Sequence, residues 1–402
     1  MADTHTSSNP RTANSVLQVL NELIEKHDES MNGSTGEERE ELTQDELDRK
    51  YELLDQLHSS LLPSLQDQLR KFLISLDLPY NEPKKHPNPD FEAACEILAQ
   101  LDQTMDETIE CIKAAALDVV PVDTHDHHFK RGKDFRCTHL FRSTSTLITY
   151  IRDMFINCDL FINHLNKPEE SRRQKLSSLF ERDVLVATTQ CIDLAGKIRK
   201  WSQASDFEVI QDEWEEKAES LNSSLETLNT LAQQPTISHS DNPAPLREHV
   251  LELSKWTMLL IKLSKMFLTK ISKTKPKKLL FTLNNAINSE TLSRLHEPAD
   301  SIVFCFERHV GTLSRSYESD LLVGGRAEMR DRIEGLSITF DLLSVLLRSC
   351  LVPLPLGFDR PSLESDFKAW LAEWKEMWHT TAQHLLNVLD GFQDAHQGQT
   401  LD

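Results

Sequence analysis

Apolar residues recur at the spacing of an α-helix along almost the whole chain. The first segment with this pattern has Val16, Leu17, Leu20, Leu23 and Ile24. The same spacing predicts further helices at about 138–166, 168–201, 205–233, 246–274, 289–322, 326–352 and 362–393. Glycine is scarce, with 11 in 402 residues, which argues against many short strands joined by tight turns. The sequence therefore predicts an all-α fold.

Short local signals predict where helices begin and where they are interrupted. Thr43 and Glu46 have the spacing of a capping box, and Asp90 stands where it can cap the following helix. Pro63 predicts a kink or a split in the second helix, because proline removes a backbone donor and clashes with the preceding turn. For the same reason Pro298 predicts a break near the start of the helix at 289–322.

The length of the chain favours two domains. Its 402 residues exceed the roughly 250–300 at which a single core usually stops growing. The segment AQQPTISHSDNPAPL has three prolines and small polar residues between two strongly periodic regions, as domain boundaries do. We therefore predict two antiparallel helix bundles, at 13–233 and 247–394, joined by a linker at 234–246. The polar ends, 1–12 and 395–402, are predicted to be disordered.

Charge and cysteine content restrict partners and location. The formal net charge of −20 would repel nucleic-acid phosphates, so we predict no nucleic-acid partner. The seven cysteines are far apart and lie mostly in apolar stretches, as buried thiols of a reducing compartment do. The N-terminal MADTHTSSNPRTANS lacks a secretory pattern, and no apolar segment approaches the roughly 18–20 residues that span a bilayer. We expect the cytoplasm or the nucleus, without integral membrane association.

Common catalytic and cofactor motifs are absent from the sequence. It contains no G-x-x-x-x-G-K-[ST] phosphate loop, no G-x-G-x-x-G, no H-E-x-x-H and no G-x-S-x-G. Residues that meet only in space leave no such motif, so this absence lowers the odds of an enzyme without excluding one. We predict no cofactor and no catalytic residue.

One segment, THDHHFKRGKDFRCTH, gathers side chains of the type that bind zinc. The candidate ligands are His125, His127, His128, Cys137 and His139. Their spacing matches no standard zinc module, and the lysines and arginines between them would oppose a bound cation. We favour a solvated loop without metal, and keep a metal-binding protein or enzyme that uses this loop as the alternative.

The segment Ser254–Lys278 is a basic amphipathic helix followed by a connection. It has eight lysines, and no acidic residue lies between Glu252 and Glu290. At 100° per residue an apolar arc lies opposite a basic one. The apolar arc has Trp256, Leu260, Leu263, Phe267 and Ile271, and the basic arc has Lys255, Lys262, Lys265, Thr269 and Lys273. We favour a core helix whose lysines pair with acidic neighbours such as DEWEEKAE, and keep a membrane-surface or calmodulin-binding helix as the alternative.

The end of this segment, KTKPKKLLF, resembles the short docking motif that cyclins bind. Pro276 should stop the helix and leave a basic group followed by apolar residues in a connection. The partner-binding candidates are Lys275, Lys277, Lys278, Leu279, Leu280 and Phe281. The apolar half could equally be buried between helices.

Near the C-terminus, Trp370, Trp374 and Trp378 recur every four residues on one face of the predicted helix. This stripe predicts a core seam, with a flat ligand platform as the alternative. The C-terminal half as a whole has a helical layout with the segments KISKTKPKK, LHEPADSIVFCFERHV, IEGLSITFDLLSVLLRSC and FKAWLAEWKEMWHTTAQHLLNVL.

This layout resembles that of the cyclin-D-interacting (GCIP-type) proteins, and is similar also to uncharacterised fungal helical proteins. The resemblance covers about 150 residues as order and pattern, and transfers no binding residue. It implies an acidic, all-α protein that binds regulatory proteins without catalysis. Together with the composition, it predicts an adaptor or regulatory protein whose partner is another protein.

Overall fold

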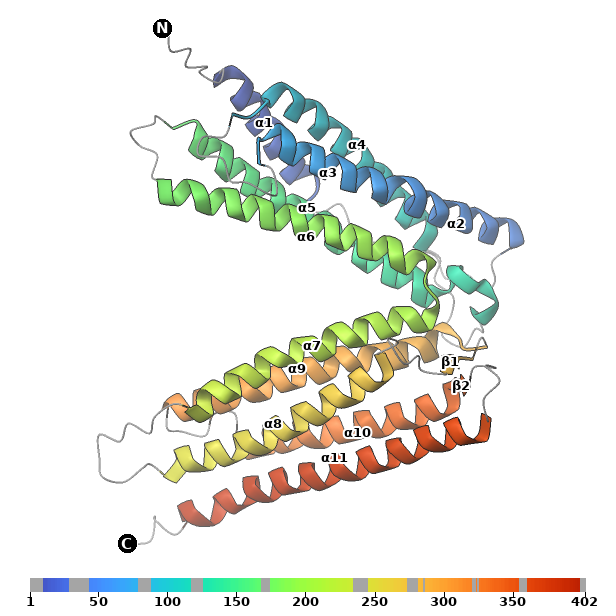
Figure 1. Cartoon of the computed structure of the whole chain (residues 1–402), viewed down its shortest axis with the longest axis vertical. Coiled ribbons are helices and arrows are strands. Elements are labelled where there is room, and N and C mark those ends of the chain that lie inside the picture. The colour runs from blue at the N-terminus through green and yellow to red at the C-terminus, as the bar shows by residue number, and fades with distance from the viewer. Residues whose placement is uncertain are drawn as a thin grey trace. The chain divides into compact units, whose positions relative to one another are not determined.

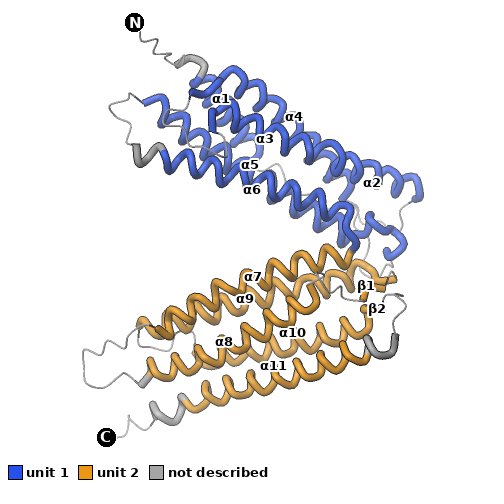
Figure 2. The backbone as a smooth tube through the Cα atoms, in the orientation of Figure 1, with its two compact units in different colours: residues 1–205 blue, residues 206–402 orange. Residues whose placement is uncertain are grey.

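The computed structural model describes residues 10–28, 43–78, 88–116, 126–167, 174–233, 245–272, 281–284, 286–319, 323, 325–353 and 360–397. These residues are helical almost throughout, which confirms the predicted all-α class (Figure 1). The chain divides into two compact units, residues 1–205 and 206–402, which Figure 2 shows in different colours. We call them unit 1 and unit 2. In the part of the chain that is described, no helix is both long and apolar enough to cross a membrane.

Unit 1 is built around a closed ring of four helices, α3, α4, α5 and α6. Helix α1 packs on α4 and α5, and α2 packs on α4. The elements of unit 1 are α1 (Pro10–Lys26), α2 (Gln44–Gln56), the π-helical turn η1 (Leu57–Leu61), α3 (Leu62–Ser75), α4 (Phe91–Ala116), the 3-10 turn η2 (Asp126–Gly132), α5 (Asp134–Leu165) and α6 (Gln174–Gln203).

The local signals in unit 1 act as predicted. Thr43 Oγ1 accepts from the Glu46 amide at 3.3 Å, and Glu46 Oε2 accepts from the Thr43 amide at 2.9 Å, so the capping box forms. Asp90 Oδ1 likewise accepts from the Ala93 amide at 3.1 Å. The turn η1 separates α2 from α3 just before Pro63, which confirms the predicted split.

Unit 2 has a ring of the same kind, in which α8, α9, α10 and α11 each pack against two of the others. Helix α7 packs on α8 and α9. The elements of unit 2 are α7 (Asp206–Gln233), α8 (Pro245–Ser272), β1 (Phe281–Leu283), α9 (Ser289–Ser319), α10 (Arg326–Cys350), β2 (Leu351–Pro353) and α11 (Arg360–Gln397). Its largest fully buried side chains include Trp214, Trp374, Trp378, Phe267 and Phe340.

The division between the units differs from the linker that we predict at 234–246. It falls between Ser205 and Asp206, because the apolar face of α7, with Ile210, Trp214 and Leu221, is buried where α7 packs on α8 and α9. The proline-rich segment therefore connects two helices of unit 2. Residues 234–244 lie outside the described residues, and α8 begins at Pro245.

Four smaller predictions are corrected. Helix α9 continues through Pro298, since one lost backbone bond is offset by buried residues on both sides, such as Leu295 and Ile302. The strands β1 and β2 pair antiparallel, with Phe281 opposite Pro353, where the sequence predicts helix and connection. Strands of three residues are too short to show an alternating pattern. Helix α1 begins at Pro10 and α11 ends at Gln397, inside the predicted disordered ends, and residues 1–9 and 398–402 are not described.

Candidate functional site

An open groove of about 630 Å³ lies between α8 and α11. These two helices pack side by side in unit 2 (Figure 1). We call it the α8–α11 groove. Its lining residues are Leu259, Lys262, Leu263, Met266, Glu373, Glu376, Met377, Thr380 and Thr381. Three large apolar side chains remain exposed to solvent in it, namely Leu259 (44%), Met266 (40%) and Met377 (45%). Burying such side chains is favourable, so the groove is a candidate binding surface.

Helix α8 supplies one wall of the groove because its outer face mixes lysines with apolar residues. Lys255, Leu259, Lys262, Met266 and Lys270 are all exposed, and they follow each other at spacings of three or four residues, which places them on one face. The opposite face packs in the core, as the basic-helix prediction requires. Leu260, Phe267 and Ile271 are fully buried, while Trp256 and Leu263 are half-buried.

Helix α11 supplies the other wall, and the tryptophan stripe holds it in place. Trp374 and Trp378 are fully buried. The indole of Trp374 donates to the Leu263 carbonyl at 2.9 Å, and that of Trp378 donates to Ser337 Oγ at 3.0 Å. The Trp374 ring also lies 4.6 Å from the ring of Phe267 on α8, measured between centroids. These contacts confirm the predicted core seam, and because both rings are buried they form no ligand platform.

The two walls of the groove carry opposite charges. Lys262 lies on the α8 wall, and Glu373 and Glu376 lie on the α11 wall, all three exposed. Lys270 extends the basic side and lies 5.6 Å from the ring centroid of Trp370. An apolar floor between a basic and an acidic edge resembles the usual arrangement of protein interfaces, an apolar core within a polar rim. The charges would orient whatever binds there.

The predicted pairing between the basic helix and the acidic segment DEWEEKAE is confirmed at one lysine. Lys265 Nζ lies 3.5 Å from Glu219 Oε2 and donates to Asn222 Oδ1 at 2.7 Å. Both partners are on α7. Lys265 therefore helps to hold α7 against α8, whereas Lys255 and Lys262 point to solvent.

Residues of the His-rich segment do not converge on one point. His127 and His128 are exposed on η2, Cys137 is buried in α5, and His139 packs on the Trp201 ring at 4.6 Å between centroids. Among the described residues, no group of three or more metal-ligand atoms within 4.8 Å of one another includes His127, His128 or Cys137. His125 lies outside the described residues.

Contacts around η2 give this segment a structural role. Asp126 Oδ2 accepts from the Asp134 amide at 3.1 Å and so satisfies a donor at the start of α5. Arg131 pairs with Asp55 at 2.8 Å, and the hydrogen bond lowers the pKa of that carboxyl. Arg136 is buried and donates to carbonyls at the end of α6, among them that of Trp201 at 2.8 Å. Arg131 and Arg136, whose charges in the sequence argue against a bound cation, therefore hold helix ends together.

The docking candidates after α8 fall mostly outside the described residues. Lys275, Lys277, Lys278, Leu279 and Leu280 lie in the stretch 273–280, which is not described. Phe281 is described, on β1, where it is 8% exposed and its ring lies 5.3 Å from that of Phe367. This burial supports the interhelical alternative for Phe281.

Two other clusters of charged side chains are satisfied by their own partners. Lys26 Nζ lies between Asp102 and Asp106, at 2.5 and 2.7 Å, beside His27. Burial lowers the pKa of Lys26, but the hydrogen bonds to the two carboxylates outweigh it and leave the pKa raised. The lysine thus supplies the positive charge that a metal ion would otherwise bring.

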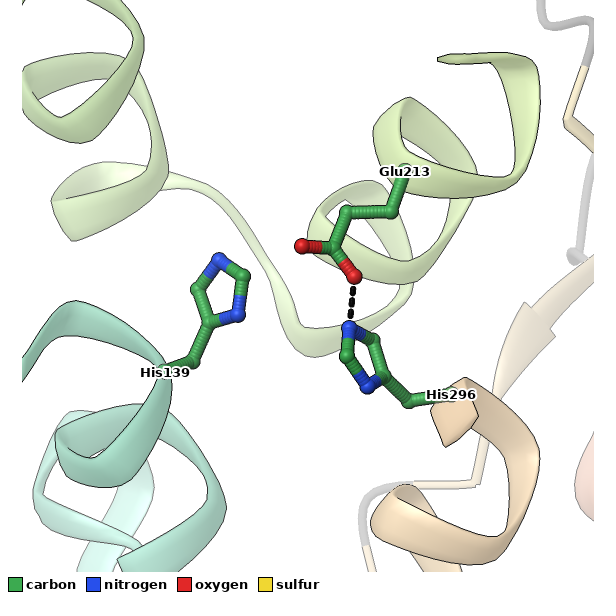
Figure 3. Close-up of side chains that lie close together, drawn as sticks. All are labelled: His139, Glu213 and His296. Atoms are coloured by element: carbon green, nitrogen blue, oxygen red, sulfur yellow. Dashed lines mark ion pairs between the residues drawn. The ribbon is translucent and has the colours of Figure 1, made fainter. Parts of the chain in front are cut away.

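The second cluster joins α7 to α9. Glu213 pairs with His296, as Figure 3 shows. One turn further along both helices, Lys217 Nζ pairs with Asp300 at 2.5 Å. The two pairs advance in the same direction along both helices, so α7 and α9 run parallel. The two ion pairs fix the register of α7 on the ring formed by α8, α9, α10 and α11.

Sequence reasoning missed the apolar residues of the α8–α11 groove. A signal was present, because Leu259 and Met266 fall on the lysine-bearing arc of α8, where a solvated face would have polar residues. Met377 on α11 gave no comparable signal. Only the packing of α8 against α11 brings the three together.

Two families of uncharacterised domains match adjacent parts of the chain. Residues 50–203 are similar to a Domain of unknown function (DUF8723), and residues 205–387 are similar to a Domain of unknown function (DUF8721). The matched ranges meet at the division between unit 1 and unit 2. No curated protein matches the chain.

Proposed function

We propose that this protein acts by binding another protein, without catalysis, and that the α8–α11 groove accepts an amphipathic helix of the partner. The observation that carries the proposal is the exposure of Leu259, Met266 and Met377 in one groove. Grooves of this kind bind helices whose apolar residues recur at i, i+3 or i+4 and i+7. Methionine side chains are flexible and polarisable, which suits them to such surfaces.

The charges on the two walls predict the chemistry of the partner helix. Its edge along α8 should be acidic, to meet Lys255 and Lys262, and its edge along α11 should be basic, to meet Glu373 and Glu376. Such complementarity affects the association rate and the specificity more than the affinity. We place this activity in the cytoplasm or the nucleus. It agrees with the role in binding regulatory proteins that the resemblance to GCIP-type proteins implies.

The burial of the apolar arc of α8 disfavours the alternative in which this helix binds anionic lipid or calmodulin. Phe267 is fully buried, and the Trp256 ring stacks on that of His384 at 4.8 Å between centroids. Exposing them would open the core of unit 2. The outer face could still meet a membrane, but Glu373 and Glu376 beside it would repel anionic headgroups.

A photo-cross-linking experiment tests the proposal. A photoreactive amino acid at position 259 should capture a partner from cells of the native host, and mass spectrometry of the cross-linked peptide should identify an amphipathic helix with one acidic and one basic edge. The same amino acid at position 74 is the matched control, because Ile74 on α3 is even more exposed, at 71%.

Substitutions in the groove provide a second test of the proposal. Leu259→Glu with Met266→Glu should weaken binding of the captured helix at least about tenfold, because it places charge on the apolar floor. Ile74→Glu should leave binding unchanged. Equal binding by the groove variant and the wild type would refute the groove as the site. Sedimentation with anionic vesicles that is lost only in the groove variant would assign the surface to lipid instead.

A further inference from the structure

Helix α10 of unit 2 has an apolar stripe on its outer face. Ile338, Leu342 and Val345 are 61%, 61% and 65% exposed, which is more than Leu259, Met266 or Met377 in the α8–α11 groove. Their spacing of four and three residues places them in one line. The opposite face of α10, with Phe340 and Leu347, is already buried where the helix packs on α9 and α11. Packing among the described residues of unit 2 therefore gives no reason for the outer stripe to be apolar.

The stripe borders a second groove, of about 410 Å³, between α9 and α10. Leu342 and Val345 belong both to the stripe and to this groove, and Pro298 and Leu346 add apolar surface beside them. The apolar surface is thus wider than a single row of side chains.

The charges at the two ends of the stripe are opposite. Asp331 and Glu334 lie exposed at its N-terminal end, and Arg348 lies exposed at its C-terminal end. If two copies of α10 lie antiparallel about a two-fold axis near Leu342, Val345 of one copy meets Ile338 of the other. Arg348 of each copy then lies beside Glu334 of the other copy, so the two-fold axis generates two such pairs. A two-fold axis requires this kind of self-complementary surface.

Two details favour the same arrangement. Gly335 lies on the stripe, and a Cβ built there would have no neighbour within 4 Å, so the backbone of α10 is open to close approach near Arg348 of the second copy. Glu334 is bound to Arg330, but Arg330 also pairs with Asp390 and would keep that partner if Glu334 turned to a second copy. A parallel arrangement would instead place like charges together.

We propose that this chain forms a two-fold symmetric dimer in which the outer faces of two α10 helices pack antiparallel. The inference is independent of the proposed function, because it uses a different face of unit 2. The α8–α11 groove stays open in the dimer. Each dimer would therefore present two such grooves.

Sedimentation-velocity ultracentrifugation of the full chain over a wide concentration range tests the proposal. The wild type should show a monomer–dimer equilibrium, and Leu342→Glu should raise the dimer dissociation constant at least about tenfold. Leu342 is mostly exposed, so the variant should keep its fold, which circular dichroism checks. Ile74→Glu and Met266→Glu, two exposed apolar positions elsewhere, should leave the dissociation constant unchanged.

A charge exchange tests the antiparallel register. Arg348→Glu alone should weaken the dimer, because it sets two carboxylates side by side. Adding Glu334→Arg should restore the wild-type dissociation constant to within about threefold, as expected for coupled neighbours. A wild type that stays monomeric at every concentration would overturn the proposal, and so would a dimer that Leu342→Glu leaves intact. Failure of the double variant to recover would refute the antiparallel register.

Discussion

His309 should make unit 2 sensitive to acid. The side chain lies on α9, is 1% exposed, and has its Nε2 atom 3.2 Å from Thr257 Oγ1 of α8. The Thr257 hydroxyl donates its proton to the Leu253 carbonyl at 2.8 Å, so it accepts from His309 Nε2. His309 Nδ1 has no hydrogen-bond partner among the described residues. Protonation would therefore put an unsatisfied donor and a charge in the core.

The size of this loss of stability follows from the shift in the pKa of His309. Burial, followed by repulsion from the Arg332 guanidinium on α10, lowers the pKa of His309 from 6.5 to about 4. Each pKa unit corresponds to about 1.4 kcal/mol, so the neutral ring contributes about 3 kcal/mol of stability. Because the folded pKa is the lower one, this contribution is complete above pH 6.5 and is lost as the pH falls from 6.5 to about 4.

Urea unfolding of the wild type and of His309→Gln at pH 7 and pH 4.5 measures the effect. Tryptophan fluorescence follows mainly unit 2, since five of the six tryptophans lie after residue 205. Other groups also titrate, so the informative quantity is the difference between the two proteins. The wild type should lose about 2.5 kcal/mol more than His309→Gln between the two pH values.

His128→Gln is the control, because His128 is exposed and lies on unit 1. Its unit 2 should lose the same unfolding free energy between pH 7 and pH 4.5 as unit 2 of the wild type. If the wild type and His309→Gln lose the same stability between pH 7 and pH 4.5, then His309 is protonated in the folded state without cost. That result would refute the argument from burial.

Three further predictions concern the cores. Arg136→Met should destabilise unit 1 by about 3 kcal/mol in urea unfolding followed by circular dichroism, since carbonyls at the end of α6 lose their donor. Trp374→Ala should destabilise unit 2 by about 4 kcal/mol, whereas Met377→Ala, at an exposed position on the same helix, should change stability by less than about 0.5 kcal/mol. Burial raises the pKa of the Cys191 thiol to about 12, so iodoacetamide at pH 8 should label it only after unfolding, as mass spectrometry would detect.

Helix class and most helix positions followed from the sequence because they depend on local periodicity. Thr43, Asp90 and Pro63 act within a few residues of themselves, so their effects could be predicted without a partner. The tryptophan stripe was predictable for the same reason, because residues four apart on a helix must share a face. Pro298 shows the limit of local rules. A proline breaks an isolated helix, but packing on both sides carries α9 through it.

Tertiary structure alone decided which helices belong together and which apolar residues stay exposed. The proline-rich segment at 234–246 has the composition of a domain boundary, yet α7 belongs to unit 2 because its buried face is covered by α8 and α9. The α8–α11 groove brings Leu259 and Met266 together with Met377, which is more than a hundred residues away in the sequence. A local sequence pattern cannot predict contacts between residues so far apart. The same holds for α10, where Ile338, Leu342 and Val345 match the helical period but only the neighbours of the helix determine which face is left uncovered.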